Sequence, residues 1–239
     1  MGSAGNIEYV VDTKEVEICS FEIERIHNKI SNATLEARES QLILRFTTDG
    51  VFAEDNENEM NNLAYRCFSA LAYEFGFSIQ NLRRGGSTLP KMDGKLSAVI
   101  NAFGFSWSIE APRKCLDDNV QHILESSAVV DDYDIQLIHQ FVIARSEMDN
   151  VSRFMFLYNL ALQVNSDNQK QLDESILRID PSCDTSGSPI GNWNETVYTR
   201  LRNQLAHYRC NTNFENTRKE VRGVVNKFQK VVSAMLPRI

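Results

Sequence analysis

Three residues near the end of the chain have side chains suited to acid–base and phosphate chemistry. The stretch RLRNQLAHYR, residues 200–209, places Arg202, Asn203 and His207 within about one and a half turns of an expected helix. Histidine titrates near neutral pH and therefore suits proton transfer. The planar guanidinium of arginine holds a phosphate through two parallel hydrogen bonds. The stretch is either part of a catalytic site or an ordinary polar helix surface.

The helix expected to position these residues covers 193–209, with Asn192 as its N-cap and Glu195 three residues later. At about 100° per residue, Asn203 and His207 lie on one side together with Arg200. Arg202 lies about 140° from His207, so a second copy of the chain could supply the other half of a site. A narrow apolar stripe should face the core: Val197, Leu201, Leu205 and Tyr208.

The second half of the chain has helical periodicity and few strand signals. Residues 150–164 are apolar nearly all round, which is typical of a central helix in a bundle. Residues 180–192 are rich in Pro, Gly and Ser and predict a loop. The other helices are expected at 114–126, 132–147, 168–178 and after the capping-box pattern Thr212–Glu215. The pattern predicts an all-α bundle of about five helices over 113–239.

The first half of the chain mixes strand and helix signals. Residues 7–19 and 41–48 have the pattern of strands, and 57–75 have that of an amphipathic helix. Gly85-Gly86 predicts a plain turn, and residues 103–110 predict another strand. The expected fold class is α+β, with a mixed α/β domain at 1–112 that recognises or regulates, followed by the helical bundle.

Charge is distributed unevenly along the chain. The net charge is −7, but residues 192–239 hold nine Lys or Arg against three Glu, which gives +6. The rest of the chain holds 16 basic and 29 acidic residues, which gives −13. A basic end on an acidic body is typical of a protein with a local phosphate-binding face. Arg200 and Arg209, which flank the motif, are candidates for RNA-backbone contacts, although each could equally be a solvated surface charge.

Neither a metal nor a cofactor is expected. The four histidines are far apart, no CxxC or HxxxH pair exists, and Asp131, Asp132 and Asp134 have the pattern of an acidic first helical turn. The five cysteines are widely spaced, which indicates reduced thiols and a cytoplasmic protein. No run of about 18 apolar residues exists, so no membrane contact is expected.

The segment Arg202-Asn203-Gln204-Leu205-Ala206-His207 resembles the signature of the HEPN superfamily. That signature is an Arg, four to six further residues and a His, commonly with a polar residue, often Asn, right after the Arg. It lies on the penultimate helix of a C-terminal bundle, as in this chain. The resemblance covers roughly residues 130–239 and does not extend to the N-terminal half.

The resemblance implies a metal-independent endoribonuclease that acts as a dimer. Such an enzyme uses the RNA 2′-OH as nucleophile, with an acid and a base for the proton transfers and a cation for the phosphorane charge. Here His207 would transfer protons, Arg202 would hold the phosphate, and Asn203 would orient the His or bind a phosphate oxygen. The products would be a 2′,3′-cyclic phosphate and a 5′-OH.

Three functions remain open from the sequence. The first is a HEPN ribonuclease of a prokaryotic toxin–antitoxin or antiphage system, with RNA as substrate, a homodimer through the helical domain, and an antitoxin or other regulatory partner. The second is a non-catalytic HEPN-like module that binds RNA, a nucleotide or a protein. The third is a helical interaction protein in which the motif is incidental. The combination of Arg202, Asn203 and His207 favours the first, whereas the net acidity of the chain favours the others.

Overall fold

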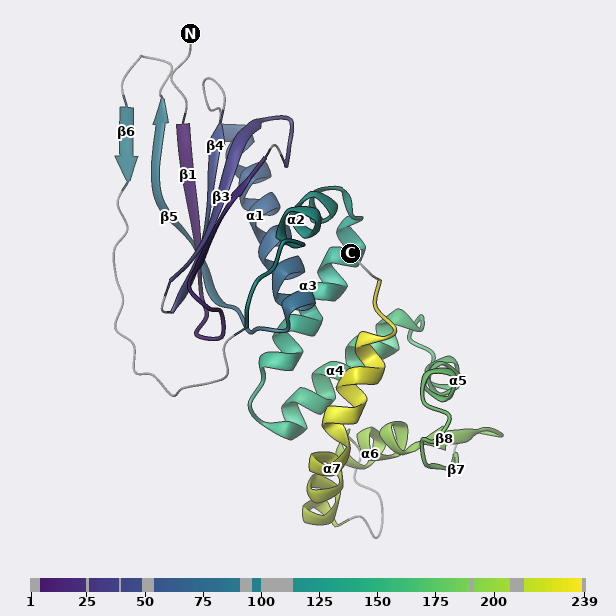
Figure 1. Ribbon diagram of the computed structural model, residues 1–239. Helices are drawn as coiled ribbons and strands as arrows, with labels where there is room; N and C mark the ends of the chain where they lie inside the picture. The colour runs from purple at the N-terminus through teal and green to yellow at the C-terminus, as the bar shows by residue number, and fades with distance from the viewer. Residues whose placement is uncertain are drawn as a thin grey trace. The chain divides into compact units, whose positions relative to one another are not determined.

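The computed structural model shows an α+β protein made of two compact units (Figure 1). Unit 1 comprises Met1–His139 with Ile239, and unit 2 comprises Gln140–Arg238. The structure describes residues 5–24, 26–38, 40–48, 54–90, 96–99, 114–189, 191–206 and 213–237. Each unit is therefore considered by itself below.

An antiparallel sheet of six strands is the centre of unit 1. The strands are β1 Gly5–Asp12, β2 Cys19–Ile23, β3 Ile30–Arg38, β4 Gln41–Thr48, β5 Gln80–Pro90 and β6 Leu96–Val99. Their order across the sheet is β2-β3-β4-β1-β5-β6, and each pair of neighbours is antiparallel. The strand predicted at 41–48 is confirmed as β4, whereas the strand predicted at 103–110 lies outside the described residues.

One face of the sheet is apolar and buried, as alternating strands require. Its central side chains come from β1, β3 and β4: Ile7, Tyr9, Val11, Ala33, Leu35, Ala37, Leu42, Leu44 and Phe46. The opposite face carries ion pairs such as Arg45–Glu8 at 2.8 Å. The predicted alternation over 7–19 is confirmed only as far as Asp12, because Val16 instead bridges Lys114 and Ile18 is 67% exposed.

Helix α1, Glu54–Phe75, covers the buried face of the sheet (Figure 1). Its apolar stripe includes Met60, Leu63 and Phe68, which are all buried. The Tyr9 hydroxyl donates to Asn61 Oδ1 at 2.7 Å and so ties the sheet to the helix. The amphipathic helix predicted at 57–75 is confirmed, with its start three residues earlier.

The predicted turn at Gly85-Gly86 is wrong, because both glycines lie inside β5. Ile7 pairs with Ser87 and Tyr9 pairs with Arg84, so two glycines stand opposite the single residue Glu8. This is a β-bulge. A Cβ added at Gly85 would lie 2.7 Å from Glu8 Oε1 and 3.1 Å from Val10 Cγ2, so a larger residue there would require these side chains to shift.

Helix α2, Val120–Val129, and the first part of α3, Asp132–Ser146, belong to unit 1. Arg66 of α1 donates to the carbonyl oxygens of Ser127, at 2.8 Å, and Val130, and it pairs with Asp132. The division between the units therefore falls after His139, within α3, rather than at the expected boundary of 112/113.

Unit 2 contains α4 Asn150–Val164, α5 Gln169–Ile179, β7 Thr185–Gly187, β8 Asn194–Thr196, α6 Val197–Ala206 and α7 Phe214–Ser233. The helices predicted at 132–147, 150–164 and 168–178 are confirmed as α3, α4 and α5, and the last predicted helix as α7. Aromatic rings meet in the core, where Phe228 stacks on Tyr198 with centroids 4.3 Å apart and is tilted against Phe154 with centroids 5.4 Å apart. The side of α4 that carries Phe156, which is 49% exposed, does not contribute to this core.

Two local predictions in unit 2 are wrong. The segment expected to be only a loop contributes β7, which pairs with β8, so the unit is not purely helical. Helix α6 starts at Val197 rather than at residue 193, because Asn194–Thr196 form the second strand of that hairpin. The cap of α7 is Asn213, whose side chain accepts from the Asn216 amide at 3.1 Å.

Candidate functional site

Helix α6 carries Arg202 and Asn203, whereas His207 and Arg209 lie outside the described residues. Its buried side chains are Tyr198, Thr199, Leu201 and Asn203. Val197 and Leu205 are only partly buried. The predicted core stripe is therefore confirmed for Leu201 and only in part for Val197 and Leu205, while Tyr208 lies outside the described residues. Tyr198 stacks on Phe228 of α7, while Thr199 and Asn203, four residues apart, lie on one side of the helix and bond groups of α4, α5 and β8.

Asn203 lies inside the protein, with 4% of its surface exposed. Its Nδ2 donates to Glu195 Oε2 of β8 at 3.4 Å, and its Oδ1 accepts from Gln169 Nε2 of α5 at 3.4 Å. Oδ1 also accepts from Arg202 Nη1 at 3.1 Å. The expected position of Asn203 on the side of the helix opposite the core is wrong, because its amide satisfies buried polar groups of neighbouring elements.

The guanidinium of Arg202 is held by two contacts. One is the hydrogen bond to Asn203, and the other is the Tyr158 ring, whose centroid lies 5.6 Å from Arg202 Cζ. Its Nε is buried and makes no hydrogen bond. Among the residues that the structure describes, no carboxylate forms an ion pair with Arg202, so its charge is kept and its Nη2 group has no protein acceptor. Such a cation is suited to an anionic ligand.

Tyr158 of α4 connects Arg202 to a buried polar network. Its hydroxyl lies 3.1 Å from Thr199 Oγ1, which donates to Asp173 Oδ1 at 2.6 Å. Burial raises the pKa of Tyr158 to about 12, and the nearby charge of Arg202 acts in the opposite direction. The phenol therefore stays neutral at physiological pH and presents its ring to the guanidinium.

Asp173 of α5 is the other end of this network, and its surface is 1% exposed. Oδ1 accepts from the Thr196 amide at 3.0 Å and from the Thr196 hydroxyl at 2.7 Å. Oδ2 accepts from Trp193 Nε1 at 3.1 Å. The carboxylate thus fixes the start of α6 against α5. The sequence analysis did not identify these network residues. One signal was present: Asp173 lies between Leu172 and Ile176, the apolar residues of the buried side of α5.

Arg200, predicted to bind RNA, is engaged within the protein. It pairs with Glu220 of α7 at 2.7 Å and donates to Gln204 Oε1 at 3.5 Å. Both Arg202 and Arg200 were predicted to contact the substrate, but their electrostatic surroundings differ. The first keeps its charge, and the charge of the second is balanced by a carboxylate.

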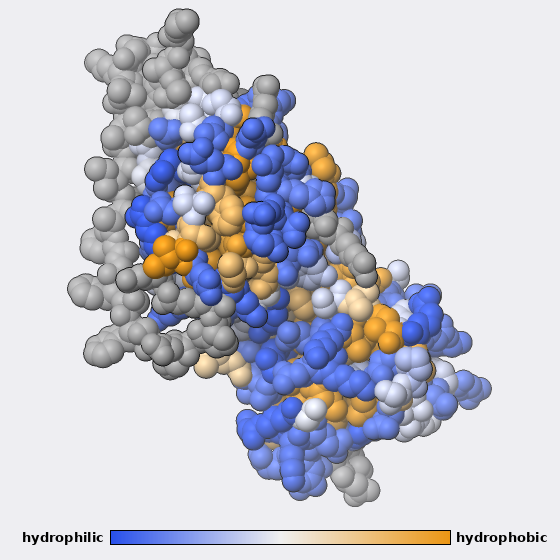
Figure 2. Space-filling model, in the orientation of Figure 1, coloured by the Kyte–Doolittle hydropathy of each residue, from blue (hydrophilic) through white to orange (hydrophobic). Residues whose placement is uncertain are grey.

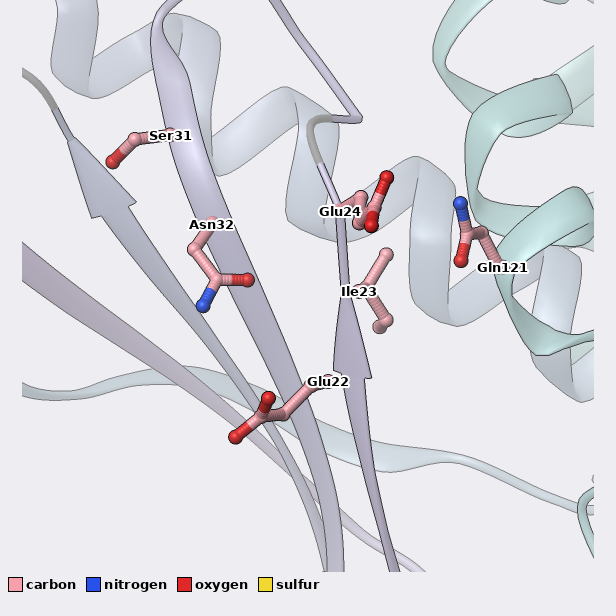
Figure 3. Close-up of a pocket in the computed structure, with 6 residues that line it drawn as sticks. All are labelled: Glu22, Ile23, Glu24, Ser31, Asn32 and Gln121. Atoms are coloured by element: carbon pink, nitrogen blue, oxygen red, sulfur yellow. The ribbon is translucent and has the colours of Figure 1, made fainter.

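Unit 1 has no comparable arrangement among its described residues. One hollow, of about 630 Å³, lies beside β2, β3 and α2, where Glu22 and Asn32 face the opening with Gln121 at its edge (Figure 3). The acidic first turn of α3 is confirmed, with Asp132 engaged by Arg66. In the described parts of both units, no group of three or more His, Cys, Asp or Glu residues could hold a metal ion.

Comparisons with known proteins do not place the chain in a family. No protein-family model matches it, and no curated protein and no solved structure does so either. None of the helices that the structure describes is long and apolar enough to cross a membrane. What the site does must therefore be argued from its own geometry.

Proposed function

We propose that this protein is a metal-independent endoribonuclease of the HEPN type. The observation that carries the proposal is the state of Arg202. Its guanidinium is fixed by the Tyr158 ring and the Asn203 amide, and no carboxylate in the described structure neutralises it. The motif residue His207 follows Ala206, the last residue of α6.

A fixed and uncompensated guanidinium matches what phosphate-ester cleavage needs. Negative charge grows on the non-bridging oxygens as the 2′-oxygen attacks phosphorus, and a cation that is already in place stabilises it without reorganisation. The Nη2 group and the remaining Nη1 hydrogen of Arg202 are the donors for those oxygens. Asn203 then acts as a positioning residue that holds Arg202, not as a phosphate ligand, because its amide is buried.

His207 supplies the proton transfer in this proposal. A base takes the proton from the 2′-OH, and an acid gives a proton to the 5′-oxygen as its bond to phosphorus breaks. The products are a 2′,3′-cyclic phosphate on one fragment and a 5′-OH on the other. No metal enters the reaction.

The proposal includes a homodimer through unit 2. One chain offers one motif histidine, whereas the reaction uses both an acid and a base, and two-fold symmetry would bring two histidines and two arginines together. Light scattering at micromolar concentration should therefore give twice the chain mass of 27.3 kDa. A monomer with full activity would contradict this part of the proposal.

In this proposal unit 1 is a regulatory or recognition domain, not a second catalytic centre. Its described residues hold no group that could bind a metal ion, and its sheet and α1 form a separate core. In a toxin–antitoxin or antiphage system, a regulatory protein such as an antitoxin could act on it. Ribonuclease activity in a fragment limited to unit 1 would contradict this assignment.

A second candidate function is a non-catalytic module that binds RNA, a nucleotide or a protein. The burial of Asn203 favours it, because the residue after the motif arginine is used to join α5, β8 and α6. In that case Arg202 binds an anion but takes part in no reaction.

Incubation of end-labelled RNA with the purified protein in EDTA separates the two functions. The nuclease predicts fragments with 2′,3′-cyclic phosphate ends for wild type and about 10²–10⁴-fold slower cleavage for His207→Ala. Binding without cleavage supports the non-catalytic module. Cleavage that continues unchanged in His207→Ala contradicts the proposed role of the motif.

A further inference from the structure

Seven basic side chains of unit 2 fall into two settings. Four of them face carboxylates, in the pairs Arg200–Glu220 at 2.7 Å, Arg218–Glu215 at 3.6 Å, Lys227–Asp180 at 2.7 Å and Lys170–Glu174 at 3.9 Å. Lys219, Arg222 and Lys230 are exposed, and none of the three makes an ion pair or hydrogen bond with a described residue. The second group therefore keeps its positive charge toward solvent.

These three residues lie on one face of α7 together with Asn226. Successive spacings of three, four and four residues place Lys219, Arg222, Asn226 and Lys230 along one side of a helix. At 1.5 Å per residue this α7 stripe is roughly 16 Å long. Gly223 lies beside the stripe, and a Cβ added there would meet no atom within 4 Å, so the surface is open.

Arg153 of α4 adds a fourth cation at the middle of the α7 stripe. Its Nη2 donates to Asn226 Oδ1 at 3.0 Å and to Asn150 Oδ1 at 2.7 Å. Both acceptors are neutral amides, so the guanidinium is held in place without loss of its charge. Its Nε is buried and makes no hydrogen bond.

The acidic groups near the N-terminal half of α7 already have partners within the protein. Glu215 pairs with Arg218, and Glu220 pairs with Arg200. Asp149 caps α4 by accepting from the Ser152 amide at 2.8 Å, and this hydrogen bond together with the charge of Arg218 lowers its pKa. Figure 2 shows mainly hydrophilic residues at the lower end of unit 2, below a band of hydrophobic residues.

We propose that the α7 stripe and Arg153 bind the phosphate backbone of single-stranded RNA. The inference rests on the proposed function, since this RNA would be the substrate. A row of fixed positive charges without acidic partners suits consecutive phosphates on a polyanion better than one small anion. Phe156 lies one turn along α4 from Arg153 and is 49% exposed, so it offers a stacking face for an unpaired base.

The first test measures binding rather than cleavage. A fluorescent 2′-O-methyl RNA lacks the nucleophile, so its anisotropy reports binding by the full-length protein without turnover. Lys219→Gln/Arg222→Gln/Lys230→Gln removes the charges of the α7 stripe. Lys170→Gln/Arg178→Gln/Lys227→Gln removes three other exposed charges of the same unit and is the matched control.

The stripe variant should bind at least about 10-fold more weakly than wild type, and its log–log salt slope should be shallower by about 2, as expected for three lost phosphate contacts. The control variant should stay close to wild type. Equal weakening in both variants, or none in either, overturns the proposal. Tighter binding of a duplex of the same sequence overturns the assignment to single strands.

A single substitution tests the central contact more locally. Asn226→Asp places a carboxylate beside Arg153 and cancels its charge, and it should weaken RNA binding several-fold. Asn192→Asp makes the same charge change at an exposed position before β8 and should bind like wild type. Equal affinities of the two variants contradict the proposal. A protein that binds through the α7 stripe but cuts no RNA contradicts only the proposed nuclease.

Discussion

Arg202 donates to Oδ1 of its neighbour Asn203 at 3.1 Å, and this bond joins a cation that keeps its charge to a buried amide. Adjacent residues on a helix seldom interact, because their side chains lie about 100° apart. Here the pair is held from outside the helix. Asn203 is fixed by Glu195 and Gln169, and Arg202 lies over the Tyr158 ring. The position of Arg202 thus depends on β8, α5 and α4.

Replacement of Asn203 should affect stability first. Asn203→Ala leaves Gln169 and Glu195 without one buried partner each, so the free energy of unfolding should fall by about 1–3 kcal/mol. Asn159→Ala removes an exposed amide and should stay within about 0.5 kcal/mol of wild type. Urea unfolding measures both. Equal stability of the two variants would contradict the buried role of Asn203.

The Asp173 carboxylate should be more sensitive than its exposed counterparts. In Asp173→Asn the new amide group faces the Trp193 donor, so one charge-assisted hydrogen bond is lost at a cost of about 2–3 kcal/mol. Trp193 fluorescence during denaturation follows this loss. Asp184→Asn, an exposed control, should unfold like wild type. If Asp173→Asn unfolds at the same denaturant concentration as the control, the network does not stabilise unit 2.

Two leucines of α6 should differ in their importance. Leu201 is 0% exposed, whereas Leu205 is only partly buried. Leu201→Ala should cost about 2–5 kcal/mol through a core cavity, and Leu205→Ala should cost clearly less. Thermal melts of the two variants give the ranking. The reverse ranking would mean that α6 is rotated from the position described above.

His139 should make unit 1 less stable in weak acid. Burial lowers the pKa of its imidazole, which lies tilted against the Tyr65 ring with centroids 4.3 Å apart and has Nδ1 3.0 Å from Ser69 Oγ. Below about pH 6.5 the unfolded chain binds a proton that the folded chain resists. The contribution of neutral His139 to the free energy of unfolding should therefore be fully present above that pH. It should be lost gradually as the pH falls below it.

The matched variant for this effect is His139→Gln, which removes the titrating group. Between about pH 6.5 and 5 its free energy of unfolding should change less than that of wild type. The difference in slope with pH should correspond to at most about one proton bound on unfolding. Urea unfolding followed by circular dichroism at several pH values measures the difference. Parallel curves for the two proteins would show that His139 does not contribute.

Local periodicity was sufficient to predict most of the helices and one strand. The stripes at 57–75 and 150–164 and the alternation at 41–48 depend on neighbours in sequence, and each became the expected element. Gly85-Gly86 was misassigned because a bulge is defined by the partner strand, here by Glu8 of β1. A turn and a bulge use the same residues, so the sequence alone does not separate them.

The site was predicted less well than the fold. Arg202 and Asn203 were identified by type and spacing, but the burial of Asn203 is set by Gln169 and Glu195, which lie on other elements. The start of α6 at Val197 was missed for the same reason, since Asp173 fixes Thr196 from a distant helix. Interactions between residues far apart in sequence determine both the burial of Asn203 and the start of α6.

The central claim is that Arg202 is the cation that stabilises the transition state. The most direct measurement compares RNA cleavage in EDTA by Arg202→Lys and Arg200→Lys, with a thermal melt of each. Both variants keep the charge, but only Arg202→Lys removes the fork-shaped donor that the Tyr158 ring and Asn203 hold in place. We expect cleavage about 10²-fold slower or worse for Arg202→Lys, with near-normal cleavage for Arg200→Lys and similar melting of both. If Arg202→Lys cleaves RNA as fast as Arg200→Lys, the guanidinium of Arg202 is not part of the reaction, and the account is contradicted.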